Sequence, residues 1–174
     1  NNGADNMGSG LRFVGYAGIG DGILGAATGG HLLHNTIANN TDGSGEGVSI
    51  QNDCVLVFTN TIISGHPVGI DVYEESTATL ESTLWYDNQT DGTGNVITGT
   101  HNYEGDPQFV NPAGGNYHIG PGSAALDKGV DAVVSVDIDG DARPQGEAPD
   151  LGADEARPDL SLQKNVRPSQ VFPG

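Results

Sequence analysis

The fold is decided by the stretch Phe58-Thr59-Asn60-Thr61-Ile62-Ile63-Ser64-Gly65, because related stretches lie one unit before it and one unit after it. The earlier copy is Leu33-His34-Asn35-Thr36-Ile37-Ala38-Asn39-Asn40, and the later copy is Glu81-Ser82-Thr83-Leu84-Trp85-Tyr86-Asp87-Asn88. The shared step of Asn or Ser, Thr and an aliphatic residue begins at Asn35, Asn60 and Ser82, with spacings of 25 and 22 residues. Periods of ~20–50 residues are typical of solenoids, propellers and repeat arrays.

A second motif, in which Gly precedes aliphatic residues, keeps the same spacings and begins at Gly22, Gly47 and Gly69. Each unit contains short β-branched and aliphatic runs separated by Gly, Asn, Asp, Ser or Thr, which is a pattern of strands and turns. No ten-residue window of the sequence shows a helical apolar period. The sequence therefore predicts an all-β, right-handed parallel β-helix with about 22–25 residues per coil, each coil rising by one strand spacing of about 4.8 Å.

Neighbouring coils must stack their apolar residues, because one coil cannot bury its apolar face alone. One predicted inward row contains Ile37, Ile62 and Leu84, and another contains Ile23, Val48 and Ile70. Asn35 and Asn60 are predicted to lie one coil apart at the same turn, where side-chain amides can bond along the column. We prefer this structural role for them over a binding role.

The chain is strongly acidic, with 6 Lys and Arg against 23 Asp and Glu and a formal charge of −17. This charge argues against nucleic acid as a partner, since neutralising phosphates requires cations, and it favours solubility and cation binding. No run of 18 apolar residues is present, so we expect no membrane insertion. The single cysteine, Cys54, is predicted to be an inert buried thiol. Because the chain starts at Asn1 inside an apparent solenoid, we expect a fragment or processed product of an exported protein.

The repeat stops near residue 100, and a different pattern follows. It includes Asp106-Pro107-Gln108-Phe109, Gly115-Asn116-Tyr117-His118-Ile119-Gly120-Pro121-Gly122-Ser123, Asp137-Ile138-Asp139-Gly140-Asp141-Ala142-Arg143 and Asp150-Leu151-Gly152-Ala153-Asp154-Glu155. From Asp106 to Glu155 the chain resembles the closing segment of bacterial right-handed parallel β-helix proteins, a choice-of-anchor domain of the Q type. It departs from that pattern at Asn111, where Asp is usual, and at Ala124, where Pro is usual. The resemblance implies an extracellular or surface-attached bacterial protein and no particular chemistry.

We divide the chain into β-helix coils over 1–104, a capping segment over 105–156 and an extended tail over 157–174. An open β-helix end exposes strand edges and core, so it needs a cover. The candidates to plug the last coil are Phe109, Val110, Ile119 and Leu126. Arg143 lies among many acidic residues, including Asp150 and Glu155, and is predicted to be a charged hydrogen-bond hub that holds the cap loops.

The tail resembles the opening strand of a bacterial cell-surface β-sandwich repeat. Its apolar positions are those of a strand that needs a partner: Leu160, Leu162, Val166, Val171 and Phe172. We expect this possible assembly strand to dock along its own coils or onto a neighbouring subunit by strand addition. Head-to-tail docking that does not close would produce an extracellular fibre.

Asp137, Asp139 and Asp141 alternate as in a calcium loop. Ala142 and Ala148 stand where an EF-hand has Gly and Glu, so calcium is a weak candidate beside an aspartate network around Arg143. We expect no other cofactor.

Three fragments resemble elements of polygalacturonase-type glycosidases, which are also parallel β-helices and use paired carboxylates. They are Asn40-Thr41-Asp42, Asn52-Asp53-Cys54 and Gly65-His66. Their spacings of 11 and 12 residues are half a coil, which would place successive elements on different faces. A pectate-lyase reaction needs a base, and residues 11–100 contain only one basic residue, Arg12. We predict no catalytic residues.

The sequence thus predicts a non-catalytic, extracellular bacterial structural or adhesive surface module, with the fibre subunit as one form of it. Its expected partners are other copies of the chain or other surface proteins and glycans. The alternative is a carbohydrate-active β-helix or a glycan-binding module. Trp85 and Tyr86, with Tyr73 on the preceding coil, are the aromatic candidates for a glycan or partner site.

Overall fold

The computed structural model describes residues 11–14, 28–39 and 45–157. Its parallel strands stack as a β-solenoid of about three turns, which confirms the predicted all-β fold. The strands are β1 Leu11–Val14, β2 Thr28–Leu33, β3 Thr36–Ala38, β4 Glu46–Gln51, β5 Cys54–Ser64, β6 Val68–Val72, β7 Thr77–Tyr86, β8 Thr90–Thr93, β9 Val96–Thr98, β10 Asn102–Glu104, β11 Phe109–Asn111 and β12 Asn116–Ile119; a 3-10 helix, η1, covers Pro112–Gly114. Within the described ranges no helix has the length and apolar character needed to span a membrane.

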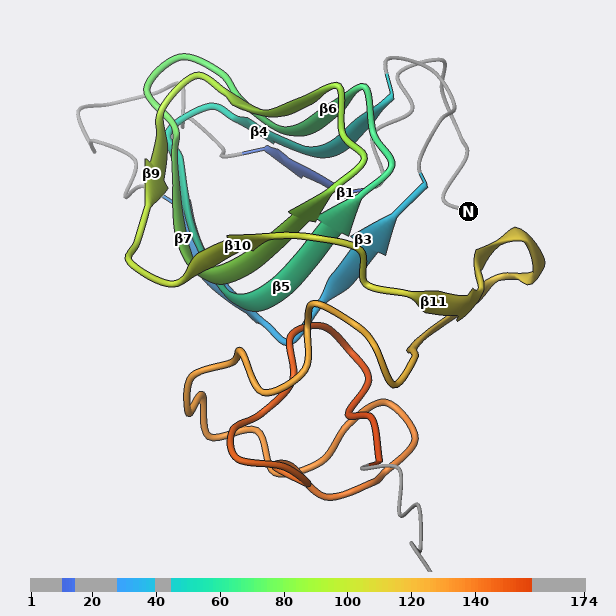
Figure 1. Cartoon of the computed structure of the whole chain (residues 1–174). Helices are drawn as coiled ribbons and strands as arrows, with labels where there is room; N and C mark the ends of the chain where they lie inside the picture. The colour runs from blue at the N-terminus through green and yellow to red at the C-terminus, as the bar shows by residue number, and fades with distance from the viewer. Residues whose placement is uncertain (1–10, 15–27, 40–44, 158–174) are drawn as a thin grey trace, which may run out of the picture.

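The coils are built from two parallel sheets. One has the strand order β1-β4-β6-β8, and the other has the order β10-β7-β5-β2, with β3 and β9 pairing to β5 and β7. Figure 1 looks along the coils, with the first sheet at the top and the second wrapping round the left side and the bottom. The long strands β5 and β7 bend between those two sides, so the coil has three faces.

The bends lie at a column of residues with left-handed backbone. Asn60 has φ 56° and Ser82 has φ 54°, and His34, between β2 and β3, has φ 51°. The register pairs Leu33 with Thr59 and Thr36 with Ile62, which places His34 beside Asn60. We call His34, Asn60 and Ser82 the bend column. Left-handed backbone is uncommon for residues other than Gly, so these positions turn each coil at a conformational cost.

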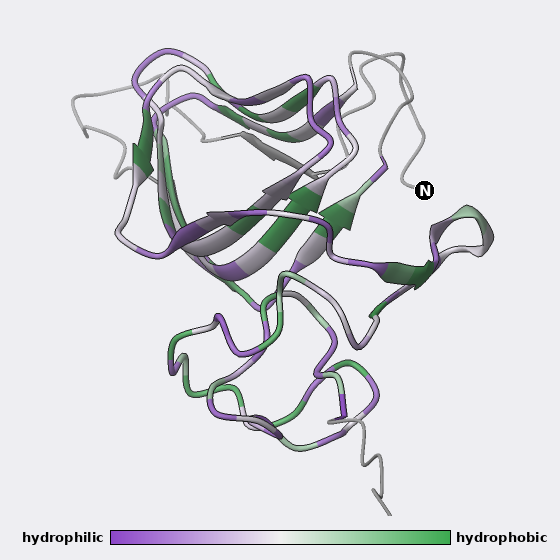
Figure 2. Cartoon of the chain, in the orientation of Figure 1, coloured by the Kyte–Doolittle hydropathy of each residue, from purple (hydrophilic) through white to green (hydrophobic). Residues whose placement is uncertain are grey.

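The interior of the coils holds one apolar core. Its buried side chains alternate along the strands, as Figure 2 shows for the strands around the interior. The cluster contains Ile37, Val48, Ile50, Cys54, Leu56, Phe58, Ile63, Ile70, Val72, Ala78, Leu80 and Trp85. Every member except Cys54 pairs in register with another member on a neighbouring strand, so the core runs from coil to coil.

The register corrects the first predicted row. Ile62 and Leu84 are neighbours as expected, but the partner of Ile62 in the preceding coil is Thr36, while Ile37 pairs with Ile63. The true spacing there is therefore 26 residues. Ile62 and Leu84 also point away from the interior and pack against the C-terminal segment. At the bend, Thr59 and Asn60 both face outward. The alternation of inward and outward side chains is therefore shifted by one residue after the bend, and Ile62 faces outward.

The second predicted row is correct only in part. Val48 pairs with Ile70, as expected. Its partner on the other side is Leu11, which is 37 residues away in sequence. Ile23, the predicted partner, lies outside the described residues. The spacing between coils is therefore not constant, and a fixed period could not locate Leu11.

The C-terminal segment after Glu104 is mostly irregular and packs on the flank of the coils (Figure 1). Its Ile119, Ala125 and Leu151 form a second apolar cluster with Ile62 and Leu84. A Cβ on Gly152 would lie 2.7 Å from Ile62 Cδ1, so glycine permits this close approach.

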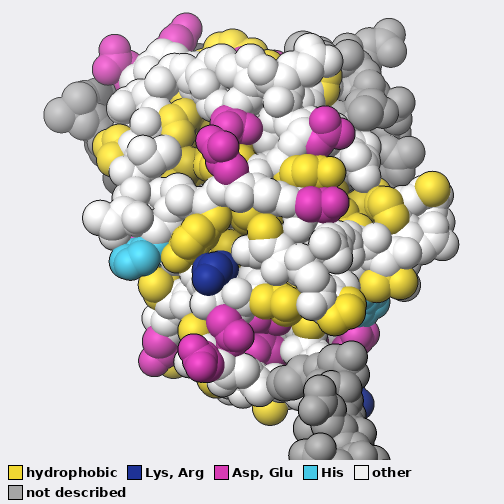
Figure 3. All heavy atoms as spheres, viewed as in Figure 1, with side chains coloured by type: hydrophobic (Ala, Val, Ile, Leu, Met, Phe, Trp, Pro, Cys, Tyr) yellow, Lys and Arg dark blue, Asp and Glu magenta, His cyan; other side chains and the backbone are white. Residues whose placement is uncertain are grey.

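The prediction that apolar residues of this segment cover the end of the last coil is therefore wrong, because they lie on the flank of the coils. Phe109 and Leu126 are partly buried against the flank cluster, and Val110 is 61% exposed. The end of the last coil instead presents a hollow bordered by Trp85, Tyr103 and residues of β8–β10. In Figure 3 apolar side chains are visible at this end, and acidic side chains gather on the C-terminal segment below it.

Candidate functional site

A buried polar network joins the loops of the C-terminal segment. The Arg143 and Glu155 side chains, both 1% exposed, form an ion pair with 2.9 Å between Nη1 and Oε2. Arg143 also donates to the carbonyl oxygens of Asp150 (3.3 Å) and Gly152 (3.0 Å). A guanidinium presents several donors in a fixed plane, so it can hold a carboxylate and two carbonyls at once.

The two buried carboxylates of this network also accept hydrogen bonds from the backbone of other loops. Glu155 accepts the backbone N–H groups of Gln145 and Asp150, each at 2.9 Å. Asp150 accepts those of Asp127 (2.7 Å) and Ala156 (2.9 Å). Burial raises the pKa of Asp150 to about 6, against the effect of these hydrogen bonds. The structure thus brings Arg143, Asp150 and Glu155 together.

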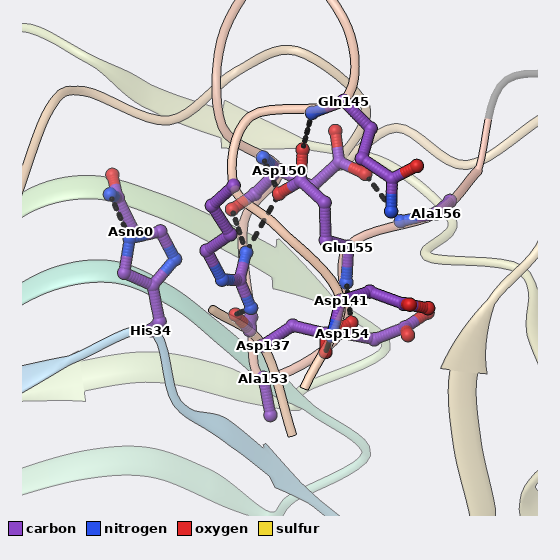
Figure 4. A network of polar contacts seen from close by, with 12 residues as sticks. His34, Asn60, Asp137, Asp141, Gln145, Asp150, Ala153, Asp154, Glu155 and Ala156 are labelled. Carbon is purple, nitrogen blue, oxygen red and sulfur yellow. Dashed lines mark hydrogen bonds and ion pairs between the residues drawn. The ribbon is translucent and has the colours of Figure 1, made fainter. Parts of the chain in front are cut away.

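The bend column connects this network to the coils. Asn60 Nδ2 donates to the Val130 carbonyl at 2.7 Å, and Val130 N donates to Asn60 Oδ1 at 2.9 Å. Asn60 Nδ2 also lies 2.9 Å from His34 Nε2, which must therefore accept. Figure 4 shows His34 and Asn60 on the coil side, facing Asp150 and Glu155 of the C-terminal segment.

His34 is neutral in this environment. Burial, together with the positive charge of Arg143, lowers its pKa from 6.5 to about 4. Since Nε2 accepts from Asn60, the ring proton lies on Nδ1, and the backbone carbonyls of Asp150 and Gly152 oppose part of the fall in the pKa. The alignment of the repeats did not predict a role for His34. Its position directly before the step of Asn, Thr and an aliphatic residue could have indicated that it lies at the bend.

Asn35 does not stack on Asn60. Its side chain is half-buried and donates to the Leu33 carbonyl at 3.0 Å, within its own turn. His34 takes the place opposite Asn60 because the coil spacing is one residue longer than the motif suggested. The predicted asparagine column is therefore replaced by a histidine–asparagine pair.

The three aromatic candidates do not form a strip. Trp85 is 8% exposed, belongs to the interior core and borders the hollow at the end of the last coil, away from Tyr73. Tyr73 and Tyr86 are 39% and 37% exposed, but Tyr73 follows β6 of one sheet and Tyr86 ends β7 of the other. Tyr73 donates its hydroxyl to Glu46 at 3.0 Å.

The predicted calcium residues turn toward different partners. Asp137 accepts the backbone N–H groups of Asp139, Asp141 and Glu155 at 2.8–3.1 Å. Asp141 forms a two-pronged pair with Arg157, the shortest contact being 2.6 Å. Asp139 lies 2.7 Å from His118 Nε2. The expected alternative, direct contact of these aspartates with the Arg143 side chain, is also not observed.

The glycosidase-like fragments are not brought to one exposed face. Asp42 lies outside the described residues. Asn52 and Asp53 form an exposed turn between β4 and β5, whereas Cys54 is buried in the interior core, where burial raises its pKa. His66 is 1% exposed, and its Nε2 lies 3.2 Å from the Ile37 carbonyl.

One exposed surface was not singled out from the sequence. It consists of the outward residues of β2, of β9 and of β5 and β7 before their bends, and we call it the side face: His31, Leu33, Val55, Val57, Thr77, Thr79 and Ile97. The row of Leu33 continues in Thr59 and Glu81, so the side face carries one carboxylate, that of Glu81. Leu33, Val55 and Ile97 are 36%, 38% and 50% exposed. The described C-terminal segment covers a different face (Figure 1).

Comparisons with protein-family models, with curated proteins and with solved structures gave no match for this chain. The described fold defines it as a parallel β-solenoid. The predicted assembly strand, Leu160, Leu162, Val166, Val171 and Phe172, lies outside the described residues.

Proposed function

We propose that this chain is a non-catalytic structural or adhesive module of an extracellular bacterial surface protein. The observation that carries the proposal is the side face, where β-branched and threonine side chains align in columns on an acidic protein. Val57, for example, has His31 and Thr79 as neighbours, and Thr79 is followed by Ile97. Exposed apolar patches on soluble proteins commonly mark interaction sites.

A stacked coil suits such a role, because its hydrogen-bond ladders hold side chains at a regular spacing of about 4.8 Å from coil to coil. With Glu81 as its one carboxylate, this surface can contact an extended partner with less repulsion than the net charge of −17 would cause elsewhere. Another copy of this chain, or an uncharged glycan, has the required chemistry.

The bacterial and extracellular setting rests on the resemblance of residues 106–155 to choice-of-anchor segments. The resemblance of the tail to a cell-surface sandwich strand agrees with the same setting. Assembly into a fibre through the tail is a further form of this proposal. The burial of Trp85 and the scattering of Asp53 and His66 support a non-catalytic role over a carbohydrate-active one.

The test compares two double variants of equal charge. Val55→Lys/Ile97→Lys places charge on the side face, whereas Val110→Lys/Val133→Lys changes residues of the C-terminal segment that are 61% and 95% exposed. Retention of labelled protein is measured on immobilised native protein and on an immobilised neutral polysaccharide, and release of sugar is assayed separately on pectin. We expect the side-face variant to lose at least about 10-fold in retention and the control to keep it. Equal retention of both variants, or release of reducing sugar from pectin, contradicts the proposal.

A further inference from the structure

Three potential metal ligands converge on the C-terminal segment. They are His118 of β12, Asp139 of the loop after Val136 and Asp154 near the end of the described chain. One ligand atom of each lies within 4.8 Å of the other two. We propose that His118, Asp139 and Asp154 form a binding site for a divalent transition-metal ion of the zinc type. This inference is independent of the proposed surface function.

Asp154 distinguishes this cluster from ordinary surface carboxylates. The residue is only 7% exposed. Its Oδ2 accepts the backbone N–H of Ile119 at 2.8 Å, which holds the carboxylate against β12. A buried carboxylate is costly unless it is hydrogen-bonded, paired or coordinates a metal. One of its oxygens lies within 4.8 Å of a ligand atom of His118 and of Asp139, so a cation bound between the three would pair with its charge.

His118 is oriented as a metal ligand would be. Asn116 Oδ1 accepts the backbone N–H of His118 at 3.1 Å, which identifies this atom as the amide oxygen. The same oxygen faces His118 Nδ1 at 2.5 Å, so Nδ1 carries a proton. Nε2 then faces Asp139 Oδ2 at 2.7 Å, where it can hold either a second proton or a cation. A ligating histidine typically donates its other ring N–H to an oxygen in this way.

The donor set selects the class of ion. Ca²⁺ and Mg²⁺ prefer all-oxygen ligands, whereas imidazole nitrogen suits Zn²⁺, Co²⁺ and Ni²⁺. Three protein ligands leave a fourth position of a tetrahedral site for water. Ligands about 2.0–2.2 Å from zinc lie roughly 3.3 Å apart, so small side-chain rotations would close the cluster around an ion. The ion would then tie β12 to two loops distant from it in sequence.

The experiment uses the full chain after treatment with a chelator and its removal. Titration calorimetry with ZnCl₂ should show one site, and CoCl₂ should produce visible absorption bands of a tetrahedral complex. His118→Gln and Asp139→Asn should each weaken zinc binding at least 10-fold. Asp141→Asn, which alters the neighbouring carboxylate paired with Arg157, is the matched control and should bind as the native chain does.

Three results would overturn the proposal. The first is no binding of either ion at concentrations up to about 1 mM. The second is an equal loss in Asp141→Asn, which would indicate diffuse acidic attraction. The third is calcium binding as tight as zinc binding. Far-UV circular dichroism of each variant verifies folding, and Asp154→Asn offers a second ligand variant that keeps an acceptor for the Ile119 N–H.

Discussion

Asn60 and Val130, which are 70 residues apart in the sequence, exchange two hydrogen bonds in the way that paired strand residues do. The side-chain amide of Asn60 takes the role that the backbone N–H and C=O of a second strand residue would have. It thereby fixes the C-terminal segment on the bend column of the coils. Gly152 N donates to the Asn60 carbonyl at 2.9 Å, so the backbone of the same residue contributes a third link.

Replacing Asn60 by Gly should destabilise the protein by about 1–2 kcal/mol, because two partly buried backbone groups of Val130 lose their partners. Asn60→Ala should cost roughly 1 kcal/mol more, since Ala tolerates the φ of 56° less well than Gly does. Urea unfolding measures both values. A loss below about 0.5 kcal/mol in Asn60→Gly would show that the amide bonds are unimportant.

Ile62 and Ile63 are adjacent but serve different cores, so their variants should fail differently. Each change to Ala should cost about 2–5 kcal/mol, since both side chains are fully buried. Ile62→Ala should release the C-terminal segment first and make residues 120–150 sensitive to limited proteolysis. Ile63→Ala should instead weaken the coils. Identical cleavage patterns in the two variants would contradict the separation of the two clusters.

Stability should depend on pH through His34. Its pKa falls from 6.5 to about 4 on folding, so the unfolded chain binds more protons between these values. Stability from this group is therefore complete above pH 6.5 and is lost as the pH falls toward 4, by about 3 kcal/mol. His34→Asn, which suits the left-handed backbone, should flatten this part of the profile of unfolding free energy.

His31→Asn is the control, because His31 is exposed on β2. The raised pKa of Asp150 acts in the opposite direction, with stability lost as the pH rises from 3.8 through about 6. The difference between the two His variants removes this contribution. An unchanged profile in His34→Asn would mean that the ring is not held neutral.

Arg143→Lys should destabilise the protein by about 1–3 kcal/mol, although it keeps the positive charge. A lysine can approach Glu155, but it lacks the planar donors that reach the carbonyls of Asp150 and Gly152. Arg143→Met should cost about 3–5 kcal/mol, because Glu155 is left as a buried charge without its partner. Thermal unfolding should rank the two variants in this order. The reverse order would contradict the role of the ion pair.

Calcium should raise the melting temperature by less than about 2 °C. The Asp137 oxygens are engaged by backbone N–H groups, and Asp141 is paired with Arg157. Binding to the native state stabilises by mass action, so a tightly held ion would be visible in a thermal scan. A rise above about 5 °C would restore Asp137, Asp139 and Asp141 as a calcium site.

The sequence by itself determined the solenoid, because two motifs shift together along the chain and stacking is the way short strands of this kind bury their apolar sides. It also indicated the neighbours Ile62 and Leu84, Val48 and Ile70, and the acidic surroundings of Arg143. These conclusions depend on local patterns, which a single sequence contains in full.

Only the tertiary structure decided which way those residues face. The left-handed backbone at His34, Asn60 and Ser82 inverts the alternation of strand faces, so Ile62 points out to the C-terminal segment and Trp85 points into the core. The position of that segment on the flank, and the meeting of His118, Asp139 and Asp154, depend on contacts between residues far apart in the chain. Pairings such as Asn60 with Val130 have no periodic signal, because each occurs once and is selected by packing rather than by repetition.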